Sequence, residues 1–246
     1  MEGTGDRHEA RSTPPSLGDN GPPARRTSTH AWGDRAVAGL VAPVALSMFA
    51  MLGGFVAHDG TTAFDTGVRL FVLAHQPPLL VTMFRWITTS GSVTPMVLYA
   101  VVIALLLALR GRVLVSAALL VAPVGAVVAY LGLKNVFART RPSGIGNVIE
   151  GTYSFPSAHA TTSAAVCCTL AYICWREGLL RWPAALALCS IAPALVGGSR
   201  VFLDVHWATD VLGGWLAGLG IAALAGLLYQ LVRRIEARHS PHEVRP

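Results

Sequence analysis

The stretch SRVFLDVHWATDVLGGWLAGLGIAALAGLLYQLV, residues 199–232, joins two different patterns. Its first twelve residues include Arg200, Asp204, His206 and Asp210, whereas the segment Val211–Val232 contains no charged residue. An α-helix needs about 20 mostly apolar residues to cross a bilayer. We therefore interpret Val211–Val232 as a membrane span that begins directly after a cluster of ionisable side chains.

The composition of the whole chain supports a membrane protein. Of its 246 residues, 53% are hydrophobic and 13% are charged, and the mean hydropathy is +0.53. The mean hydropathy is high for a soluble domain, and the charged fraction is low. The sequence predicts an all-α fold, a polytopic membrane helix bundle with about six spans. They are Ala36–Ala57, Val93–Leu109, Val113–Leu133, Ala158–Cys174, Trp182–Gly198 and Val211–Val232.

The segments outside the spans define the predicted domain boundaries. Residues 1–35 are rich in Gly, Pro, Ser, Thr and Arg and are expected to be a disordered tail, followed by one domain over residues 36–233 and a basic tail over 234–246. Residues 58–92 form a longer connection, for which we expect one or two short interfacial helices anchored by Phe84 and Trp86. A re-entrant helix pair is the alternative.

The distribution of positive charge predicts the topology. Six spans place both termini on one side, where the flanking segments carry ten Arg residues, against six Lys and Arg residues on the opposite flanks. The positive-inside rule then makes both termini cytoplasmic and predicts a multi-pass protein of the cell membrane. The net charge of +6 is explained by this topology, and no basic stripe interleaved with aromatic residues indicates a nucleic-acid partner.

Three polar clusters lie at the outer ends of the predicted spans. They are KNVFARTRP at 134–142, SFPSAHA at 154–160 and SRVFLDVHWATD at 199–210. Because all three follow or precede spans at the same face, we expect them to lie at one depth in the membrane.

Each cluster has a structural interpretation when it is considered alone. Lys and Arg at the end of a span are usually interfacial anchors, and Ser157 in FPSAHA is a good helix N-cap. A single His159 at such a position is more often structural, and Asp204 is expected to be the N-cap of an interfacial helix. His206 and Asp210 are different, because residues four apart share one face of a helix and the carboxylate can hold one imidazole nitrogen.

Together the clusters predict a phosphate site. Lys134, Arg141 and Arg200 provide fixed positive charge, and Arg in particular matches the geometry of a phosphate group. The N-terminus of a helix beginning near Ser157 adds backbone N–H donors. Ionisable groups near lipid are costly to bury and usually mark function.

These residues resemble the type 2 phosphatidic acid phosphatases, membrane lipid phosphatases that share a site with vanadium haloperoxidases. The first motif of that family, Lys, six residues, Arg-Pro, is matched by Lys134, Arg141 and Pro142. The second, Pro-Ser-Gly-His, is matched by 156–159, with Ala158 in place of Gly. The third, Ser-Arg, five residues, His, three residues, Asp, is matched at 199–210.

The resemblance implies phosphoryl transfer through a phosphohistidine. His206 would be the nucleophile, Asp210 would orient it, and His159 would be the general acid and then the general base. Lys134, Arg141, Arg200, Ser157 and the backbone at Ala158 would bind the phosphate. Two imidazoles with an ordinary pKa of about 6.5 would give a bell-shaped pH profile.

The resemblance also implies that the substrate is a lipid phosphate in the outer leaflet. Polyprenyl diphosphate is favoured, with phosphatidylglycerol phosphate or phosphatidic acid as alternatives, and no cofactor or metal site is expected because cations bind the phosphate. Three other classes remain open: a soluble acid phosphatase or haloperoxidase, a non-catalytic lipid-phosphate binder or transporter, and a purely structural membrane protein. Release of phosphate from a lipid phosphate separates an enzyme from the last two.

Overall fold

The protein folds as a bundle of α-helices, with no strand in the part of the chain that is described. The structure is a computed structural model that describes residues 29–142 and 153–239. The helices are α1 (Thr29–Asp59), α2 (Ala63–Ala74), α3 (Pro78–Ser90), α4 (Val93–Leu109), α5 (Val113–Phe137), α6 (Ala158–Arg176), α7 (Trp182–Phe202) and α8 (Ala208–His239). The predicted fold class, an all-α membrane helix bundle, is confirmed.

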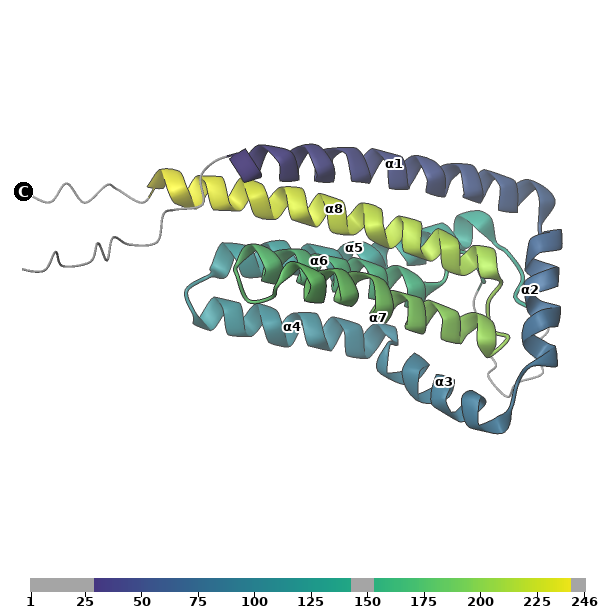
Figure 1. Ribbon diagram of the computed structural model, residues 1–246. Helices are drawn as coiled ribbons and strands as arrows, with labels where there is room; N and C mark the ends of the chain where they lie inside the picture. The colour runs from purple at the N-terminus through teal and green to yellow at the C-terminus, as the bar shows by residue number, and fades with distance from the viewer. Residues whose placement is uncertain (1–28, 143–152, 240–246) are drawn as a thin grey trace, which may run out of the picture.

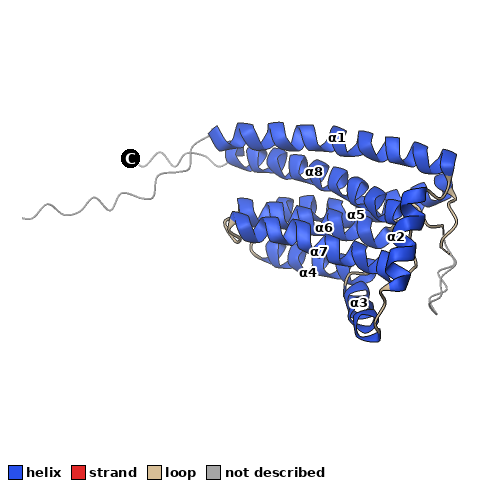
Figure 2. Ribbon diagram, turned by 45° about the vertical axis from the view of Figure 1, so that its right-hand side comes forward, coloured by secondary structure: helices blue, strands red, loops and turns tan. Residues whose placement is uncertain are grey.

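The long helices run side by side, and α2 and α3 cover one end of the bundle (Figures 1 and 2). Helix α6 packs against α8, α7, α5 and α4, and α8 packs additionally against α1 and α5. The helices α6 and α8 approach closely because α8 has small residues at the contact: a Cβ atom on Gly218 would lie 2.5 Å from the carbonyl oxygen of Thr161. Small residues of this kind allow helix backbones to approach each other in membranes.

Each of the six predicted spans corresponds to one helix, and several helices extend beyond the predicted limits. Four helices, α1, α5, α7 and α8, are long and apolar enough to cross a membrane, and α3 with α4 forms a pair bent by 47° that would make a fifth. Helix α6 does not meet this criterion, since it carries Thr161, Thr162, Ser163 and Thr169, which are all fully buried between other helices. A span count of six therefore stays a prediction.

The connection between the first two predicted spans contains two short helices. A capping box begins α2: the Thr62 side chain accepts a hydrogen bond from the Asp65 backbone N–H at 2.9 Å, and the Asp65 side chain accepts one from the Thr62 N–H. Trp86 on α3 is exposed, as an anchoring residue would be. Phe84 is half-buried, and its ring packs on Phe202 of α7 with 4.4 Å between the ring centroids, so its role as an anchor stays a prediction.

Candidate functional site

The three polar clusters meet at one end of the bundle, where α5 and α7 end and α6 and α8 begin, beside α2 (Figure 1). Hydrogen bonds join them: the Ser157 N–H donates to the Asp210 carbonyl oxygen at 3.0 Å. The guanidinium of Arg141 lies 2.9 Å from Nε2 of His206. Segments that are far apart in the sequence therefore form a single site.

The first cluster follows the end of α5. Ala138 adopts a left-handed conformation, φ 42°, and its N–H donates to the Lys134 carbonyl oxygen at 2.9 Å, which ends the helix. Lys134 is buried in the last turn of α5. The chain then turns towards α8, so that Arg139 is buried against it and Arg141 contacts His206.

The second cluster is held by an aromatic contact. The Phe155 ring is fully buried and packs on Phe49 and Phe137, with ring centroids 5.6 Å and 4.8 Å away. Ser157 is the N-cap residue of α6, as predicted, but its hydroxyl makes no capping bond. This hydroxyl is buried and has no hydrogen-bond partner in the described part of the protein. Ala158 and His159 are both half-buried in the first turn.

The Ser157 hydroxyl and the N-terminus of α6 are suited to an anion. The first N–H groups of a helix have no partner within the helix, and the helix dipole favours negative charge beside them. A phosphate oxygen at this position would receive bonds from the backbone and from the Ser157 hydroxyl. Ala158 retains its backbone N–H, so its replacement of the family Gly removes no donor.

The third cluster connects α7 to α8. Arg200 is buried in the last turn of α7, and its Nη1 donates to Thr88 Oγ1 at 2.9 Å. Asp204 is not the N-cap that the sequence suggested, because α8 begins later, at Ala208. Instead it adopts a left-handed conformation, φ 54°, and accepts two hydrogen bonds from the Arg69 guanidinium at 2.8 and 3.0 Å. The ion pair fixes α2 to this connection.

The environment of His206 determines which ring nitrogen carries the proton. Arg141 can only donate, so Nε2 must accept and carry the lone pair. Nδ1 then carries the hydrogen and donates to Asp210 Oδ2, at 3.3 Å. The same carboxylate oxygen accepts from the Trp207 N–H at 2.8 Å and from the Ser154 hydroxyl. The His206 ring therefore has an orienting carboxylate on one side and a lone pair on the other.

Burial keeps the His206 ring neutral. Its side chain is 1% exposed, and desolvation lowers the pKa of His206 from 6.5 to about 4. Asp210 opposes this shift, while Arg141 and Arg200 add to it. The ordinary imidazole pKa that the sequence analysis assumed for this residue does not hold, and the ring is available as a nucleophile at neutral pH.

Two residues that contact the site were not predicted from the sequence. Arg139 was counted only among the outer cations, yet its guanidinium donates to Asp210 at 2.6 Å and to Asp65 at 2.7 Å. Asp65 also accepts from the Thr209 N–H at 2.9 Å. Arg139 could have been suspected from its place in the first cluster, but no local signal marks Asp65.

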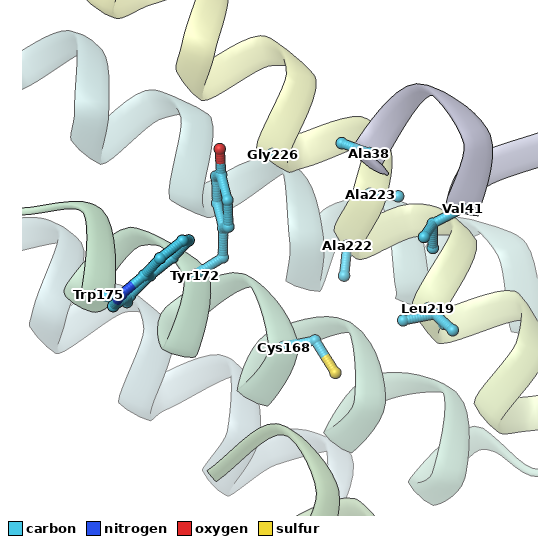
Figure 3. A pocket seen from close by; sticks show the side chains of 9 residues that line it. All are labelled: Ala38, Val41, Cys168, Tyr172, Trp175, Leu219, Ala222, Ala223 and Gly226. Carbon is cyan, nitrogen blue, oxygen red and sulfur yellow. The ribbon is translucent and has the colours of Figure 1, made fainter. Parts of the chain in front are cut away.

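Apolar hollows lie on the surface of the described part of the bundle. A cavity of about 380 Å³ between α1, α6 and α8 is lined by small apolar residues together with Tyr172 and Trp175 (Figure 3). It contains none of the predicted site residues. A groove of about 460 Å³ is lined by Val72 of α2, Phe84 of α3 and residues of α7 up to Phe202. Gly198 and Val201 also line this groove, which therefore follows α7 to its last turn.

The fold and the site define a class: a membrane-spanning helix bundle with a histidine, a carboxylate and buried cations at one end. A family model described as the PAP2 superfamily matches residues 112–235, which is just over half of the 246 residues. The chain belongs to this superfamily, as the motifs predicted.

Individual relatives agree with this membership. The chain is 34% identical over 109 residues to phosphatidylglycerophosphatase B of Bacillus subtilis, which covers 43% of the chain and 50% of the relative. It is 34% identical over 131 residues to an undecaprenyl-diphosphatase of Sulfolobus acidocaldarius, with 50% and 60% covered. The chain thus spans between half and two thirds of these relatives.

A solved structure is similar over a longer part of the chain. It is the crystal structure of a transmembrane PAP2 type phosphatidylglycerolphosphate phosphatase from Bacillus subtilis. The TM-score is 0.63 at 25% identity, and the similarity covers 82% of this chain and 99% of the other. The membrane-spanning helical fold is therefore shared with a phosphatase of the same superfamily.

Proposed function

We propose that the protein is an integral-membrane phosphatase that removes a terminal phosphate from a lipid phosphate or diphosphate through a phosphohistidine. The observation that carries this proposal is the arrangement of Arg141, His206 and Asp210. It leaves Nε2 of a neutral imidazole beside a guanidinium that can also bind a phosphate oxygen. A nucleophile oriented by a carboxylate next to fixed positive charge is what phosphoryl transfer requires.

The first half-reaction forms the phosphoenzyme. The Nε2 lone pair of His206 attacks phosphorus, and the bond from phosphorus to the lipid oxygen breaks. The electron pair of that bond stays on the lipid oxygen, which takes a proton from His159. Asp210 stabilises the positive charge that develops on the His206 ring, because it accepts the hydrogen bond from Nδ1.

The second half-reaction restores the enzyme. His159 takes a proton from water as the water oxygen attacks phosphorus. The phosphorus–nitrogen bond breaks, its electron pair returns to Nε2, and inorganic phosphate leaves. Lys134, Arg141, Arg200 and the Ser157 hydroxyl stabilise the charge on the phosphate oxygens in both steps.

The apolar groove along α7 supports a lipid as the substrate. It is lined by apolar residues of α2, α3 and α7 and reaches Phe202, the last residue of α7. A hydrocarbon chain in this groove would place its phosphate near the end of α7. The relatives include a phosphatidylglycerophosphatase and an undecaprenyl-diphosphatase. We favour polyprenyl diphosphate, with phosphatidylglycerol phosphate and phosphatidic acid as alternatives.

The topology is part of the same proposal. The helix α1 begins and α8 ends at the end of the bundle opposite the site (Figure 1). With the excess of Arg residues beside those ends, the positive-inside rule makes both termini cytoplasmic. The site then faces the extracytoplasmic side and takes lipid headgroups from the outer leaflet.

The test is phosphate release by the purified full chain in detergent. The panel contains polyprenyl diphosphate, phosphatidylglycerol phosphate and phosphatidic acid, each also labelled with ³²P at the terminal phosphate. We expect release from at least one lipid and an acid-labile ³²P-protein after rapid quenching. His206→Ala should show neither, and His58→Ala, at an exposed histidine, should match the wild type. Phosphate release by His206→Ala at the wild-type rate would refute the mechanism, and no release by the wild type would favour a binder or transporter.

A further inference from the structure

A chain of buried ionisable side chains extends from the proposed nucleophile to α2. Asp210 accepts from Arg139 at 2.6 Å, and the same guanidinium donates to Asp65 at 2.7 Å and to the Gly60 carbonyl oxygen at 2.7 Å. The side chains of Asp65 and Asp210 are 0% exposed and that of Arg139 is 4% exposed. Asp65 lies outside the sequence motifs of the site, and Arg139 is one of the six unspecified residues of the first motif.

Thr209, the residue before Asp210, binds both Arg139 and Asp65. Its hydroxyl lies 2.7 Å from the Arg139 guanidinium and 2.8 Å from Asp65, and its backbone N–H donates to the other Asp65 oxygen at 2.9 Å. The capping box at Thr62 fixes Asp65 on the first turn of α2. The guanidinium therefore has a defined position relative to Asp210 and, through it, to His206.

Burial strengthens the electrostatic interactions between these groups. A buried cation paired with a single carboxylate would neutralise that carboxylate. Here Arg139 is shared between two carboxylates, so the three groups together carry one net negative charge. In a site of low polarity such a charge acts strongly on a neighbouring imidazole.

We propose that Asp65 is a positioning residue for the phosphatase reaction: it engages Arg139 and thereby leaves Asp210 with the negative charge that His206 needs as a nucleophile. The inference rests on the proposed function, in which His206 attacks phosphorus. It extends the site to α2, an element outside the three motifs, and gives α2 a role in the chemistry.

The sign of the effect follows from the charges. In Asp65→Asn the Arg139 guanidinium is left to Asp210 alone, and the net charge of the three positions rises from −1 to 0. The imidazolium form of His206 loses stabilisation, so the ring pKa falls and the ring becomes a weaker nucleophile. In the double variant Asp65→Asn, Arg139→Met the net charge is again −1 and now sits on Asp210, so the ring pKa rises to the wild-type value or above it.

Other charged groups around His206 stay the same in these variants. Arg141 after α5 contacts the ring, and Arg200 of α7 acts on it by charge. Asp204 and Arg69 form their own pair between the α7–α8 connection and α2. Lys134 in the last turn of α5 and His159 in the first turn of α6 are further ionisable residues among those that the structure describes at these helix ends. A change that appears only with Asp65 and Arg139 is therefore assigned to them.

The experiment measures two properties of the full chain in detergent. The first is ¹⁵N NMR of the histidine rings, with His206 assigned by difference from His206→Ala, which reports the ring pKa and tautomer whether or not the protein is active. The second is phosphate release as a function of pH. For Asp65→Asn we expect the ring pKa to fall by about half a unit to one unit and kcat to fall about 2- to 10-fold, since the rate follows the basicity of the nucleophile. The double variant should reverse the pKa change.

The control is Glu177→Gln at the opposite end of the bundle. Glu177 is also a mostly buried carboxylate, 10% exposed, that is paired with Arg112 and Arg233, so its replacement tests for a general loss of stability. We expect it to lower the unfolding temperature and to leave the His206 pKa unchanged.

The outcomes separate the inference from the proposed function. A wild-type protein that releases no phosphate refutes the proposed function, while the NMR result still decides whether Asp65 controls the ring. An active wild type with an unchanged ring pKa and kcat in Asp65→Asn refutes the inference. If Asp65→Asn does not fold, the double variant provides the test. A His206 pKa below the wild-type value in the double variant contradicts the charge argument. A His206 pKa at or above the wild-type value supports it.

Discussion

The close contact between α6 and α8 makes activity sensitive to a single methyl group. A Cβ atom on Gly214, one turn after Asp210, would lie 2.7 Å from the Ala160 Cβ, 2.9 Å from the Ser157 carbonyl oxygen and 3.1 Å from the Thr161 nitrogen. Ordinary contact begins at 3.4 Å, so Gly214→Ala requires the helices to separate by roughly 0.5 to 0.7 Å at this point. Two of the three atoms belong to the α6 backbone, which cannot move aside as a side chain does.

The displaced segment carries Ser157 and His159, while Gly214 is on the helix that carries Asp210. The groups proposed to bind phosphate and to act as acid and base would therefore shift relative to the proposed nucleophile. Misplacement by about 1 Å costs on the order of 100-fold in rate, so a shift of this size should lower kcat by about 10- to 100-fold. Overpacking should also destabilise the fold by about 1 to 3 kcal/mol.

The assay compares phosphate release and thermal unfolding in the same detergent for Gly214→Ala and for Gly132→Ala. Gly132 is exposed on α5 with no atom within 4 Å of an added Cβ, so its replacement should be neutral or stabilising by up to about 1 kcal/mol. Gly214→Ala with the activity and the unfolding temperature of the control would refute the reasoning, because it would show that α6 and α8 can separate without effect on the site.

Three further predictions concern the charges of the site. Because burial lowers the pKa of His206 to about 4, the unfolded chain takes up a proton that the folded ring does not, so the contribution of His206 to the unfolding free energy is present above pH 6.5 and is lost as the pH falls towards 4. The unfolding temperature should therefore change less between pH 7 and pH 4.5 in His206→Gln than in the wild type. An equal change in both proteins would contradict this. If Lys134, Arg141 and Arg200 supply the positive charge that we propose, phosphate release should continue in excess EDTA and be inhibited by vanadate. A strict Mg²⁺ requirement would count against this role of the three cations. Asp204→Asn keeps a residue type that tolerates the left-handed conformation but removes the charge that faces Arg69. The unfolding free energy should fall by about 1 to 2 kcal/mol. An unchanged unfolding temperature would show that the ion pair does not hold α2 in place.

The helices and the motif residues could be predicted because their signals are local. An uninterrupted apolar segment such as Val211–Val232 indicates a span by itself, and a spacing of four on a helix brings His206 and Asp210 to one face. The prediction was weakest where a helix is surrounded by protein. Helix α6 carries buried Thr and Ser residues that face its neighbours. Its hydropathy is therefore lower than that of the other long helices, although it lies in the centre of the bundle.

Local signals were also incomplete where a side chain has a distant partner. Asp204 precedes a helix and therefore suggested an N-cap, but Arg69, 135 residues earlier, binds its carboxylate. Phe84 suggested a membrane anchor because it lies in an amphipathic segment with Trp86, and its half-buried ring also packs on Phe202. In both cases the preference of the residue type was correct, an acidic group for a positive partner and an aromatic ring for an apolar one, and the partner was on another helix.

The same limit explains why the network behind the site escaped the sequence analysis. Asp65 and Thr209 are separated by 144 residues, and nothing near Asp65 distinguishes a helix cap from a group that also binds the site. A single capping carboxylate has two oxygens and several lone pairs, so it can accept from the Thr62 N–H at the start of α2 and from Arg139 at once. A buried ion pair is weak evidence for stability alone, since an apolar replacement is often as stable. The burial of Asp210, Arg139 and Asp65 in one hydrogen-bonded series that leads to the His206 ring is better explained by the proposed role of that ring as the nucleophile.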